Sequence, residues 1–314
     1  MNFAVGILKQ KKFMKMKYKE VIKMEMPINL NKLMEFIRIK PFEIHKKEFY
    51  LWYNDQSTKE TGEALANKLG IDYGYKPPTD KHKYIIGWGM KEIKDFPLLE
   101  FPLKDKVFIN SYTAIQNNRK KFKSLELMKK SNVKTPKHYK KEIILDKIRN
   151  KEVEFPLIAR RNKHQEGNGL KICLCIDDVK KALNGCYDYF VEYVRNYKEF
   201  RIHIFNGKPI RASKKTGYYV ENNWVRNNHN GWKFKDINIE TISEWDENII
   251  EECKKAVKSM NMVFGAVDIV YSDFNEPYVI EVNSSPALNG KGLDLYADCF
   301  IDYINNKMFK GDKK

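Results

Sequence analysis

Two oxygen-bearing side chains that could bind a metal ion lie close together in the apolar segment YVIEVNSSPAL, residues 278–288. Residues two apart in an extended strand point to the same side, so Glu281 and Asn283 share one face. A carboxylate inside an apolar strand needs a partner, and Mg²⁺ takes one or two protein carboxylates and fills its other positions with water and phosphate oxygens. The segment alone fits a second interpretation equally well, in which Glu281 and Asn283 cap the turn at residues 284–286.

A further acidic residue, Asp268, lies within another apolar run, VFGAVDIVY at residues 263–271. A short turn at residues 272–277 separates this run from the segment that carries Glu281 and Asn283. If the two runs pair as neighbouring strands, the three side chains converge. Two carboxylates and an amide on adjacent strands predict a site for magnesium and a nucleotide.

Charged and apolar side chains alternate in the run EFRIHIF, residues 199–205. The alternation predicts a strand whose polar face carries Glu199, Arg201 and His203. A half-exposed strand with a solvated face shows the same pattern. An acid and an arginine on one line also suit contacts with ribose and phosphate, whereas we expect His203 to be incidental to the chemistry.

The segment FPLIARRNKHQEGNGLKICLCI, residues 155–176, reads as two apolar strands around a loop that contains Gly167 and Gly169. Glycine permits a close backbone approach, so the N–H groups of this loop could lie over phosphates. Most hairpins with glycine are only turns, and the loop by itself is weak evidence for a nucleotide site.

The elements that precede these motifs alternate between strand and helix patterns. Residues 49–54 (FYLWYN) and 84–89 (YIIGWG) read as strands, and residues 58–69 between them have helical spacing. This order predicts a small β-α-β unit. Residues 110–128 then read as one helix, and we expect a new domain to begin near residue 107.

Length and composition fit an intracellular globular protein of two or three domains, with 314 residues of which 42% are hydrophobic. No apolar run approaches the roughly 20 residues that cross a membrane, so we expect a cytoplasmic protein. Five cysteines without a CxxC pair predict reduced, buried thiols. The net charge is +17, and residues 1–47 carry 12 basic against 4 acidic side chains. This balance favours an acidic partner, although compositional bias alone would also produce it.

Several motifs, taken in order, resemble the ATP-grasp ligases, and most closely the RimK-like glutamate ligases and similar proteins encoded by phages. The motifs span residues 107–303 and are KFKSLELMKKSNVKTP, FPLIARRNKHQEGNG, FVEYVRNYKEFRIHIFNG, VRNNHNGW, GAVDIV and YVIEVNSSPAL. The resemblance implies an α+β fold, the ATP-grasp fold, in which two α+β subdomains clasp the nucleotide behind a small α/β N-terminal domain. The boundaries that we expect are 1–47 for a basic N-terminal extension, 48–106 for the small α/β domain, 107–190 for the lid subdomain and 191–314 for the C-terminal subdomain with the metal site.

The resemblance also implies roles for individual residues. The cofactor-binding positions are Lys121 and Arg160 at the nucleotide phosphates, Gly167 and Gly169 in the loop above them, Glu192 and Tyr193 at the adenine hinge, Glu199 at the ribose and Asn228 at the terminal phosphate. The catalytic arginines are Arg201, which would face the acylphosphate, and Arg226, which would meet the terminal phosphate and the metals. Asp268, Glu281 and Asn283 match the magnesium ligands.

Two positions depart from the family pattern. The family usually has lysine in the strand before the glycine loop, where this chain has Arg160 followed by Arg161. A planar guanidinium is not a simple replacement for a compact ammonium, so the geometry of phosphate binding should differ. The family's SPG turn after the last ligand is SPA here, with Ala287. Neither change removes a metal ligand.

The activity that the resemblance implies is ATP-dependent ligation of a carboxylate to an amine through an acylphosphate, with ATP and Mg²⁺, or Mn²⁺ in its place, as cofactors. The partners would be a carboxylate substrate and an amine acceptor, which is an amino acid, a peptide or a protein terminus, and the basic charge suggests an acidic acceptor. An ATP-grasp phosphotransferase would use the same nucleotide site. A basic nucleic-acid-binding module with a decayed site is a further alternative, against which the intact trio of ligands argues. The sequence predicts no membrane contact and leaves the oligomeric state open.

Overall fold

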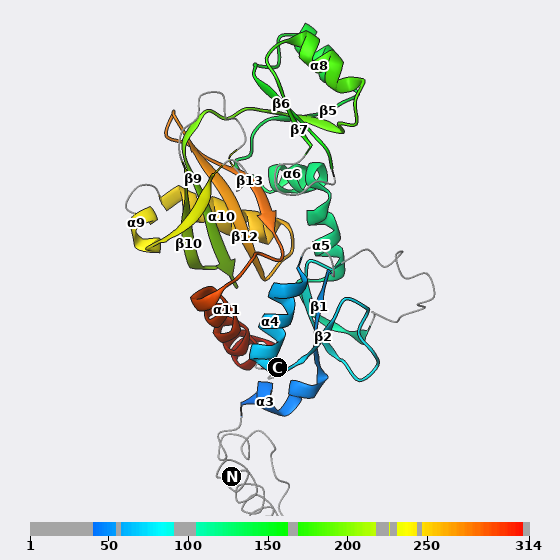
Figure 1. The fold of residues 1–314 in the computed structure, drawn as a ribbon, viewed down its shortest axis with the longest axis vertical. Coiled ribbons are helices and arrows are strands. Elements are labelled where there is room, and N and C mark those ends of the chain that lie inside the picture. Colours follow the sequence, from blue (N-terminus) through cyan, green and yellow to red (C-terminus); the bar gives the residue numbers. More distant parts are fainter. Residues whose placement is uncertain are drawn as a thin grey trace, which may run out of the picture. The chain divides into compact units, whose positions relative to one another are not determined.

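The computed structural model describes residues 40–54, 58–90, 105–162, 169–217, 226, 231–243 and 247–309 (Figure 1). Two positions expected at the phosphates, Gly167 and Asn228, lie outside these residues, as does most of the basic segment 1–47. The chain divides into two compact units, Met1–Ile44 and His45–Lys314, and the second contains all of the described strands. Among the described helices, none is long and apolar enough to cross a lipid bilayer.

A parallel four-stranded sheet opens this unit, after the short helices α3 (Pro41–His45) and η1 (Lys46–Glu48). Its strands are β1 (Phe49–Tyr53), β2 (Asp72–Gly74), β3 (Tyr84–Trp88) and β4 (Val107–Ile109), in the order β2-β1-β3-β4. Helix α4 (Lys59–Leu69) follows β1 and ends at Gly70, whose φ of 66° is left-handed. The predicted strands and the helix between them are confirmed, whereas β2 escapes prediction because its three residues show no alternation.

The stretch that the sequence predicts as one helix, residues 110–128, forms two, so this prediction is wrong. Helix α5 (Tyr112–Arg119) and helix α6 (Lys121–Lys130) are separated by Lys120, which has an extended backbone with φ −81° and ψ 90°. At the start of α6 the backbone N–H of Phe122 donates to the side-chain oxygen of Asn162 at 3.2 Å, so a contact from a distant segment satisfies one of the helix's free donors. The break places Lys121 at the first residue of α6.

An antiparallel sheet forms the next layer, with strands β5 (His138–Lys140), β6 (Leu157–Arg160), β7 (Leu170–Cys173) and β8 (Tyr189–Glu192) in the order β5-β8-β6-β7. Helices α7 (Ile144–Arg149) and α8 (Ile176–Leu183) supply Ile144, Val179 and Ala182 to its core. The predicted hairpin of β6 and β7 is confirmed. The prediction of buried thiols is wrong for Cys175 and Cys186, which are exposed. Cys175 lies beyond the end of β7, at the N-cap of α8.

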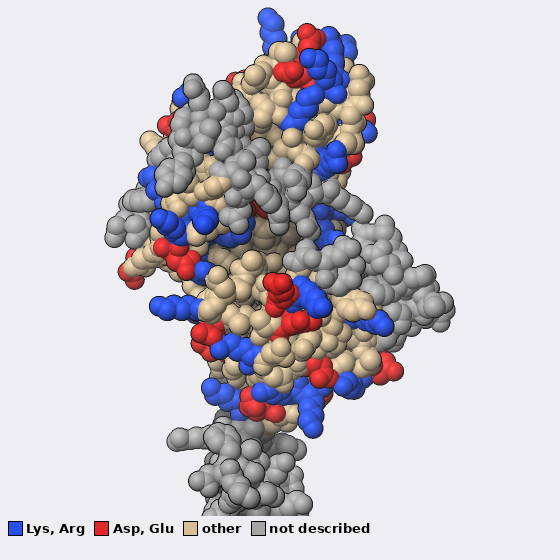
Figure 2. Space-filling model, viewed as in Figure 1, with Lys and Arg blue, Asp and Glu red and all other residues tan. Residues whose placement is uncertain are grey.

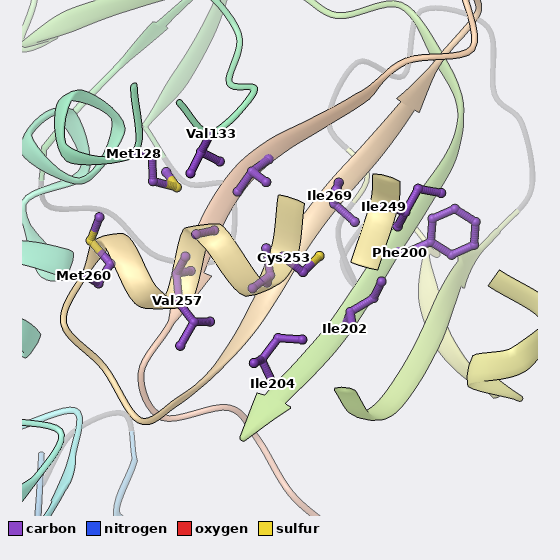
Figure 3. Packing of buried hydrophobic residues seen from close by; sticks show 14 of the residues in the cluster. Met128, Val133, Phe200, Ile202, Ile204, Ile249, Cys253, Val257, Met260 and Ile269 are labelled. Atoms are coloured by element: carbon purple, nitrogen blue, oxygen red, sulfur yellow. The ribbon is translucent and has the colours of Figure 1, made fainter. Parts of the chain in front are cut away.

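A five-stranded antiparallel sheet holds most of the residues with predicted chemistry. Its strands are β9 (Asn196–Phe205), β10 (Lys208–Thr216), β11 (Lys233–Ile237), β12 (Phe264–Ser272) and β13 (Pro277–Asn283), in the order β11-β10-β9-β12-β13. Helices α9 (Ile239–Ser243) and α10 (Glu247–Ser259) belong to the same region. Figure 3 shows Ile249, Cys253 and Val257 of α10 packed with Phe200 and Ile202 of β9. One face of the sheet is therefore apolar, and strand alternation turns the charged residues of β9 to the opposite face.

Helix α11 (Gly290–Tyr303), which continues into the π-helix η5 (Ile304–Met308), connects the parallel sheet with the polar face of the five-stranded sheet. The ring of Tyr296 lies edge-on to Trp88 of β3 at 5.8 Å and to His203 of β9 at 5.6 Å between centroids. A Cβ at Gly89 would lie 2.4 Å from Oγ of Ser285, so the end of β3 abuts the turn that follows Asn283.

Candidate active site

A row of charged residues crosses the polar face of the five-stranded sheet. The strand register places Arg201 of β9 opposite Asp268 of β12, and Asp268 opposite Glu281 of β13. Asn283 lies two residues beyond Glu281, and its side-chain nitrogen lies 3.5 Å from an oxygen of Asp268. The structure therefore brings together the two acids and the amide that the sequence pattern predicts to converge.

Asp268 is held by Arg201 in a two-point contact. Nε and Nη2 of Arg201 donate to the two carboxylate oxygens of Asp268 at 2.6 and 2.8 Å. Burial by itself would lower the pKa of Arg201, but Asp268 and two further acids raise it above its ordinary value. The ring of Phe234 lies 4.3 Å from the guanidinium and helps to fix its plane. Arg201 is therefore a permanent, oriented cation beside the predicted metal ligands.

Glu281 is surrounded by cations that come from other parts of the chain. Nζ of Lys121 lies 3.2 Å from its carboxylate and Nη2 of Arg160 lies 4.0 Å from it. Burial would raise the pKa of Glu281, but the charges of Lys121, Arg160 and Arg201 together hold it below its ordinary value. Helix α6 and strand β6 thus deliver their terminal cations to the carboxylate on β13.

These oxygen ligands fit Mg²⁺ better than a softer metal. Within the described ranges, no group of three or more His, Cys, Asp or Glu side chains could hold a metal ion. Asp268 and Glu281 supply two carboxylates and Asn283 an amide oxygen, so a cation here would need further ligands from water and phosphate. Mg²⁺ has this preference, since it is bound in proteins through one or two carboxylates plus substrate phosphates.

Glu199 and Arg226 lie toward the beginning of β9. Glu199 accepts a hydrogen bond from Lys215 of β10, yet burial dominates and raises the pKa of Glu199. Arg226 donates to the side-chain and backbone oxygens of Asn196 at 2.5 and 2.9 Å, and its guanidinium lies 5.0 Å from the ring of Trp232. Glu199 thus lies one row from Arg201 on β9, and Arg226 is held at the first residue of the same strand.

The residues expected at the adenine hinge lie at the end of β8. The carboxylate of Glu192 accepts a hydrogen bond from Tyr139 at 2.6 Å and lies 3.7 Å from Lys137. The backbone N–H of Tyr193 donates to the carbonyl of Pro156 at 3.0 Å. Burial raises the pKa of the Tyr193 hydroxyl, so it stays neutral. Because β8 pairs with β6, the hinge and Arg160 belong to one sheet.

The two departures from the family pattern have local explanations. The guanidinium of Arg160 lies 5.9 Å from the ring centroid of Tyr189, a cation–π contact that a lysine would not reproduce in the same geometry. Ala287 does not have a positive φ, so its backbone does not require glycine, and the first positive φ of this segment occurs at Gly290 with 41°. At the glycine loop, Gly169 has a φ of 79° and adjoins Arg161.

Three residues near the site escape prediction from the sequence: Lys215, Tyr296 and Arg211. Lys215 and Arg211 lie on β10, where the alternation of the run RASKK is the signal that could have placed them on the polar face. The hydroxyl of Tyr296 is hydrogen-bonded to Nδ1 of His203 at 2.9 Å, and no local sequence pattern reveals this contact between α11 and β9. His203 is buried, and its burial together with two arginines lowers its pKa to about 3, so the ring is neutral.

The charge distribution bears on the nucleic-acid alternative. In the described part of the face that Figure 2 shows, acidic side chains lie among the basic ones. Many of the described cations also contact acids, as Lys254 does with Glu251 and Lys147 with Glu152. In the described part of this face, basic side chains are thus interspersed with acidic ones, which disfavours binding of a phosphate backbone.

Comparison with known proteins adds a family and a fold. A family model described as the RimK-like ATP-grasp domain matches residues 118–305. The chain is 28% identical over 213 residues to the coenzyme gamma-F420-2:alpha-L-glutamate ligase of Methanococcus maripaludis, covering 62% of this chain and 71% of that protein. It is 24% identical over 292 residues to a probable alpha-L-glutamate ligase of Shewanella loihica, covering 81% of this chain and 92% of the relative.

Solved structures of ATP-grasp ligases have the same fold. The D-alanine–D-alanine ligase from Bacillus anthracis complexed with ATP aligns with a TM-score of 0.58 at 16% identity, over 84% of this chain and 96% of that one. The ATP-grasp ligase PsnB, complexed with a minimal precursor, Mg and ADP, aligns with a TM-score of 0.57 at 12% identity, over 81% and 96%. The predicted α+β ATP-grasp fold is confirmed.

Proposed function

The chain belongs to the family of RimK-like ATP-grasp proteins, and from this membership we propose that it joins the amine of L-glutamate to the carboxylate of a second substrate. It is an ATP-dependent carboxylate–amine ligase that uses ATP and Mg²⁺. The observation that carries the proposal is the row Arg201, Asp268 and Glu281, where two acids on paired strands are surrounded by three cations. The relatives named alpha-L-glutamate ligase support glutamate as the amino acid.

Cations and acids in this row suit separate parts of a magnesium nucleotide. We assign Lys121, the first residue of α6, and Arg160, the last residue of β6, to the phosphates, because both side chains lie beside Glu281. Glu199 is assigned to the ribose, and Glu192 with Tyr193 to the adenine at the end of β8. We also assign Gly167, Gly169 and Asn228 to the phosphates. The subdomain boundaries 107–190 and 191–314 belong to the same proposal.

Asp268, Glu281 and Asn283 would hold the metal ion. When bound there, Mg²⁺, or Mn²⁺ in its place, would supply positive charge that reduces the repulsion between the phosphates and an anionic nucleophile. In the structure the cations Lys121 and Arg201 compensate these carboxylates. Nucleotide binding lets those cations turn from the carboxylates toward the phosphates.

The reaction has two steps. A carboxylate oxygen of the donor substrate attacks the γ-phosphorus of ATP, the bond to ADP breaks, and an acylphosphate forms. The uncharged amine then attacks the carbonyl carbon, the C–N bond forms, phosphate leaves, and the proton lost by the amine passes to solvent. Arg201 and Arg226 stabilise the negative charge that develops in transfer, and no covalent bond to the protein is needed.

The carboxylate donor is proposed to be acidic overall. The chain has a net charge of +17, which favours association with an anionic partner such as a glutamate-rich peptide. One structural neighbour, PsnB, is described in complex with a precursor peptide. A peptide carboxylate is therefore the first donor class to examine, with free amino acids as the second.

Trapping with hydroxylamine tests the activity without the natural amine acceptor, because hydroxylamine itself attacks an acylphosphate. The protein is incubated with ATP, Mg²⁺, hydroxylamine and a panel of glutamate-rich peptides and amino acids, and hydroxamate and ADP are measured. We expect equimolar hydroxamate and ADP with at least one carboxylate, and an amide product with L-glutamate whose mass is the sum of both substrates minus water. A stable phosphorylated product that forms without any amine and does not react with hydroxylamine would instead support the phosphotransferase.

A further inference from the structure

Arg211 lies on the polar face of β10 and takes no part in the steps above. It pairs in register with His203, while Ser213, two residues further along, pairs with Arg201. Residues two apart share a face, so Arg211, Ser213 and Arg201 point to the same side of the sheet. From strand spacing and rise, the Cα atoms of Arg211 and Arg201 lie about 8 Å apart. Arg211 is thus a neighbour of the reaction centre on the side away from β13.

Both arginines face the same buried pair of side chains. Nδ1 of His203 lies 2.9 Å from the hydroxyl of Tyr296 on α11. After burial, the charges of Arg211 and Arg201 are the main causes that lower the pKa of His203 to about 3. The neutral imidazole adds no third positive charge beside the two guanidinium groups.

The guanidinium of Arg211 is fixed by an acid on the neighbouring strand. Its Nε and Nη2 donate to the two oxygens of Asp236 at 3.0 and 2.9 Å, and Ser213 donates to the same carboxylate at 2.9 Å. The side chain of Arg211 is 19% exposed, whereas that of Asp236 is 59% exposed. Asp236 therefore orients the arginine from the solvent side and leaves its other edge directed inward.

The inward edge is directed to the segment that follows the predicted metal ligands. A Cβ at Gly292, in the first turn of α11, would lie 2.3 Å from Nη1 of Arg211. A guanidinium has five N–H donors, of which Asp236 takes two. Among the described residues no hydrogen-bond partner of Nη1 occurs. Nη1 of Arg211 thus lies against the first turn of α11, the helix that follows the predicted metal ligands in the chain.

We propose that Arg211 binds the α-carboxylate of the acceptor amino acid and so selects an amino acid as the amine substrate. A guanidinium edge matches a carboxylate in two-point geometry, which a lysine cannot supply. The donor carboxylate reacts beside Arg201, and the α-carboxylate of an amino acid lies only two bonds from the attacking nitrogen. Neighbouring positions on one sheet face accommodate both groups. This inference rests on the proposed ligase function.

The test compares two acceptors in the variant Arg211→Gln. With the carboxylate donor found by hydroxylamine trapping, kcat/KM for L-glutamate should fall about 10- to 100-fold, mainly through KM, as expected for loss of charge-assisted hydrogen bonds. Hydroxylamine carries no carboxylate, so hydroxamate formation by Arg211→Gln should fall less than about threefold. For Arg211→Lys, kcat/KM for L-glutamate should lie between the values of the wild type and Arg211→Gln. Arg149→Gln is the matched control, because Arg149 also pairs with an aspartate but on α7.

Substrate analogues show which carboxylate is recognised. In the wild type, kcat/KM for L-glutamate α-amide should be as low as kcat/KM for L-glutamate in Arg211→Gln. Arg211→Gln itself should use L-glutamate and its α-amide equally well. L-Glutamine, which keeps the α-carboxylate, should show the same loss in the variant as L-glutamate. Melting curves of each variant show whether it is folded, and Asp236→Asn, which only loosens Arg211, should raise KM by a smaller factor.

The outcomes separate this inference from the proposed function. If the wild type forms no hydroxamate with any carboxylate, the ligase assignment fails and Arg211 loses its proposed role with it. If hydroxamate forms normally but Arg211→Gln keeps the wild-type KM for L-glutamate, only the role of Arg211 is overturned. Equal losses with hydroxylamine and L-glutamate would also overturn it, since they would show a structural effect on the whole site.

Discussion

Replacing Glu281 with glutamine should have opposite effects on metal-free nucleotide binding and on turnover. Glu281 neutralises Lys121, 3.2 Å away, and Arg160, 4.0 Å away, before any nucleotide binds. At 3.2 Å and an effective dielectric constant of 20, the direct attraction to Lys121 is about 5 kcal/mol. Desolvation of the two charges cancels much of this, so the net cost of separating them is about 1 to 2 kcal/mol.

This cost disappears in Glu281→Gln, because the neutral amide no longer attracts Lys121 and Arg160 away from the phosphates. Metal-free ADP should therefore bind the variant about 5- to 30-fold more tightly than the wild type. Turnover with Mg²⁺ and ATP should fall at least about 1,000-fold, since one of two carboxylate ligands is lost. In the wild type, Mg²⁺ should strengthen ADP binding. In Glu281→Gln, this effect of Mg²⁺ on the ADP affinity should be smaller.

Calorimetric titration with ADP, in EDTA and again in excess Mg²⁺, measures both effects, and hydroxamate formation measures turnover. Glu152→Gln is the control, because this carboxylate also pairs with a lysine, Lys147 of α7, but at a more exposed position. Weaker metal-free ADP binding in Glu281→Gln than in the wild type would refute the idea that Glu281 holds the phosphate-binding cations in reserve. Undiminished turnover would remove Glu281 from the metal site.

Three further predictions concern the same row. Asp268→Asn should reduce hydroxamate formation at least about 1,000-fold, because a metal ligand is lost. The melting temperature should change by only a few degrees, because the amide still accepts one hydrogen bond from Arg201. Wild-type activity of this variant would show that Asp268 binds no metal. Arg160→Lys should retain about a tenth of the activity, since the positive charge remains but the planar guanidinium and its contact with the ring of Tyr189 are lost. A complete loss of activity would assign the guanidinium a specific catalytic role. The pKa of Glu281 lies below its ordinary value, so its carboxylate stabilises the folded state above the unfolded pKa, about 4.3, and this contribution is lost as pH falls through the folded pKa. Urea unfolding of the wild type and Glu281→Gln should accordingly differ at pH 7, and the difference should shrink as pH falls below about 4 and vanish near the folded pKa of about 2. A difference that stays constant with pH would contradict this charge assignment.

The sequence predicts the strands of this site well because their periodicity is strong. The pairing of β12 with β13 follows from two apolar runs and a short turn, and it brings Asp268 beside Glu281 as expected. Prediction is wrong at residues 110–128, where local helical spacing continues through Lys120 but the structure breaks. A contact between Phe122 and Asn162, 40 residues apart, satisfies the new helix start, and no local pattern contains that information.

Partners on distant elements are the other part of the site that the sequence does not reveal. The motifs indicate that Lys121 and Arg160 bind phosphates, but not that both lie against Glu281. The bond between His203 and Tyr296 joins residues 93 positions apart, and it turns a histidine expected to be incidental into a link between β9 and α11. Such contacts depend on the packing of whole elements, which periodicity does not encode.

The same charges that should bind the nucleotide also stabilise the fold around the site. Asp268 and Glu281 are largely removed from water, and a carboxylate in such a place is tolerated only with a compensating cation. Arg201 supplies that cation from the neighbouring strand, whereas Lys121 and Arg160 supply it from α6 and β6. Loss of any one member therefore alters both stability and catalysis, and a single substitution cannot apportion them. Removing Lys121 and Glu281 together restores neutrality while still deleting a phosphate contact and a metal ligand, so the double variant should recover stability without recovering turnover. Recovery of stability without recovery of turnover would indicate that these charges form a ligand site. An ion-pair network that only stabilises the fold would not show this difference.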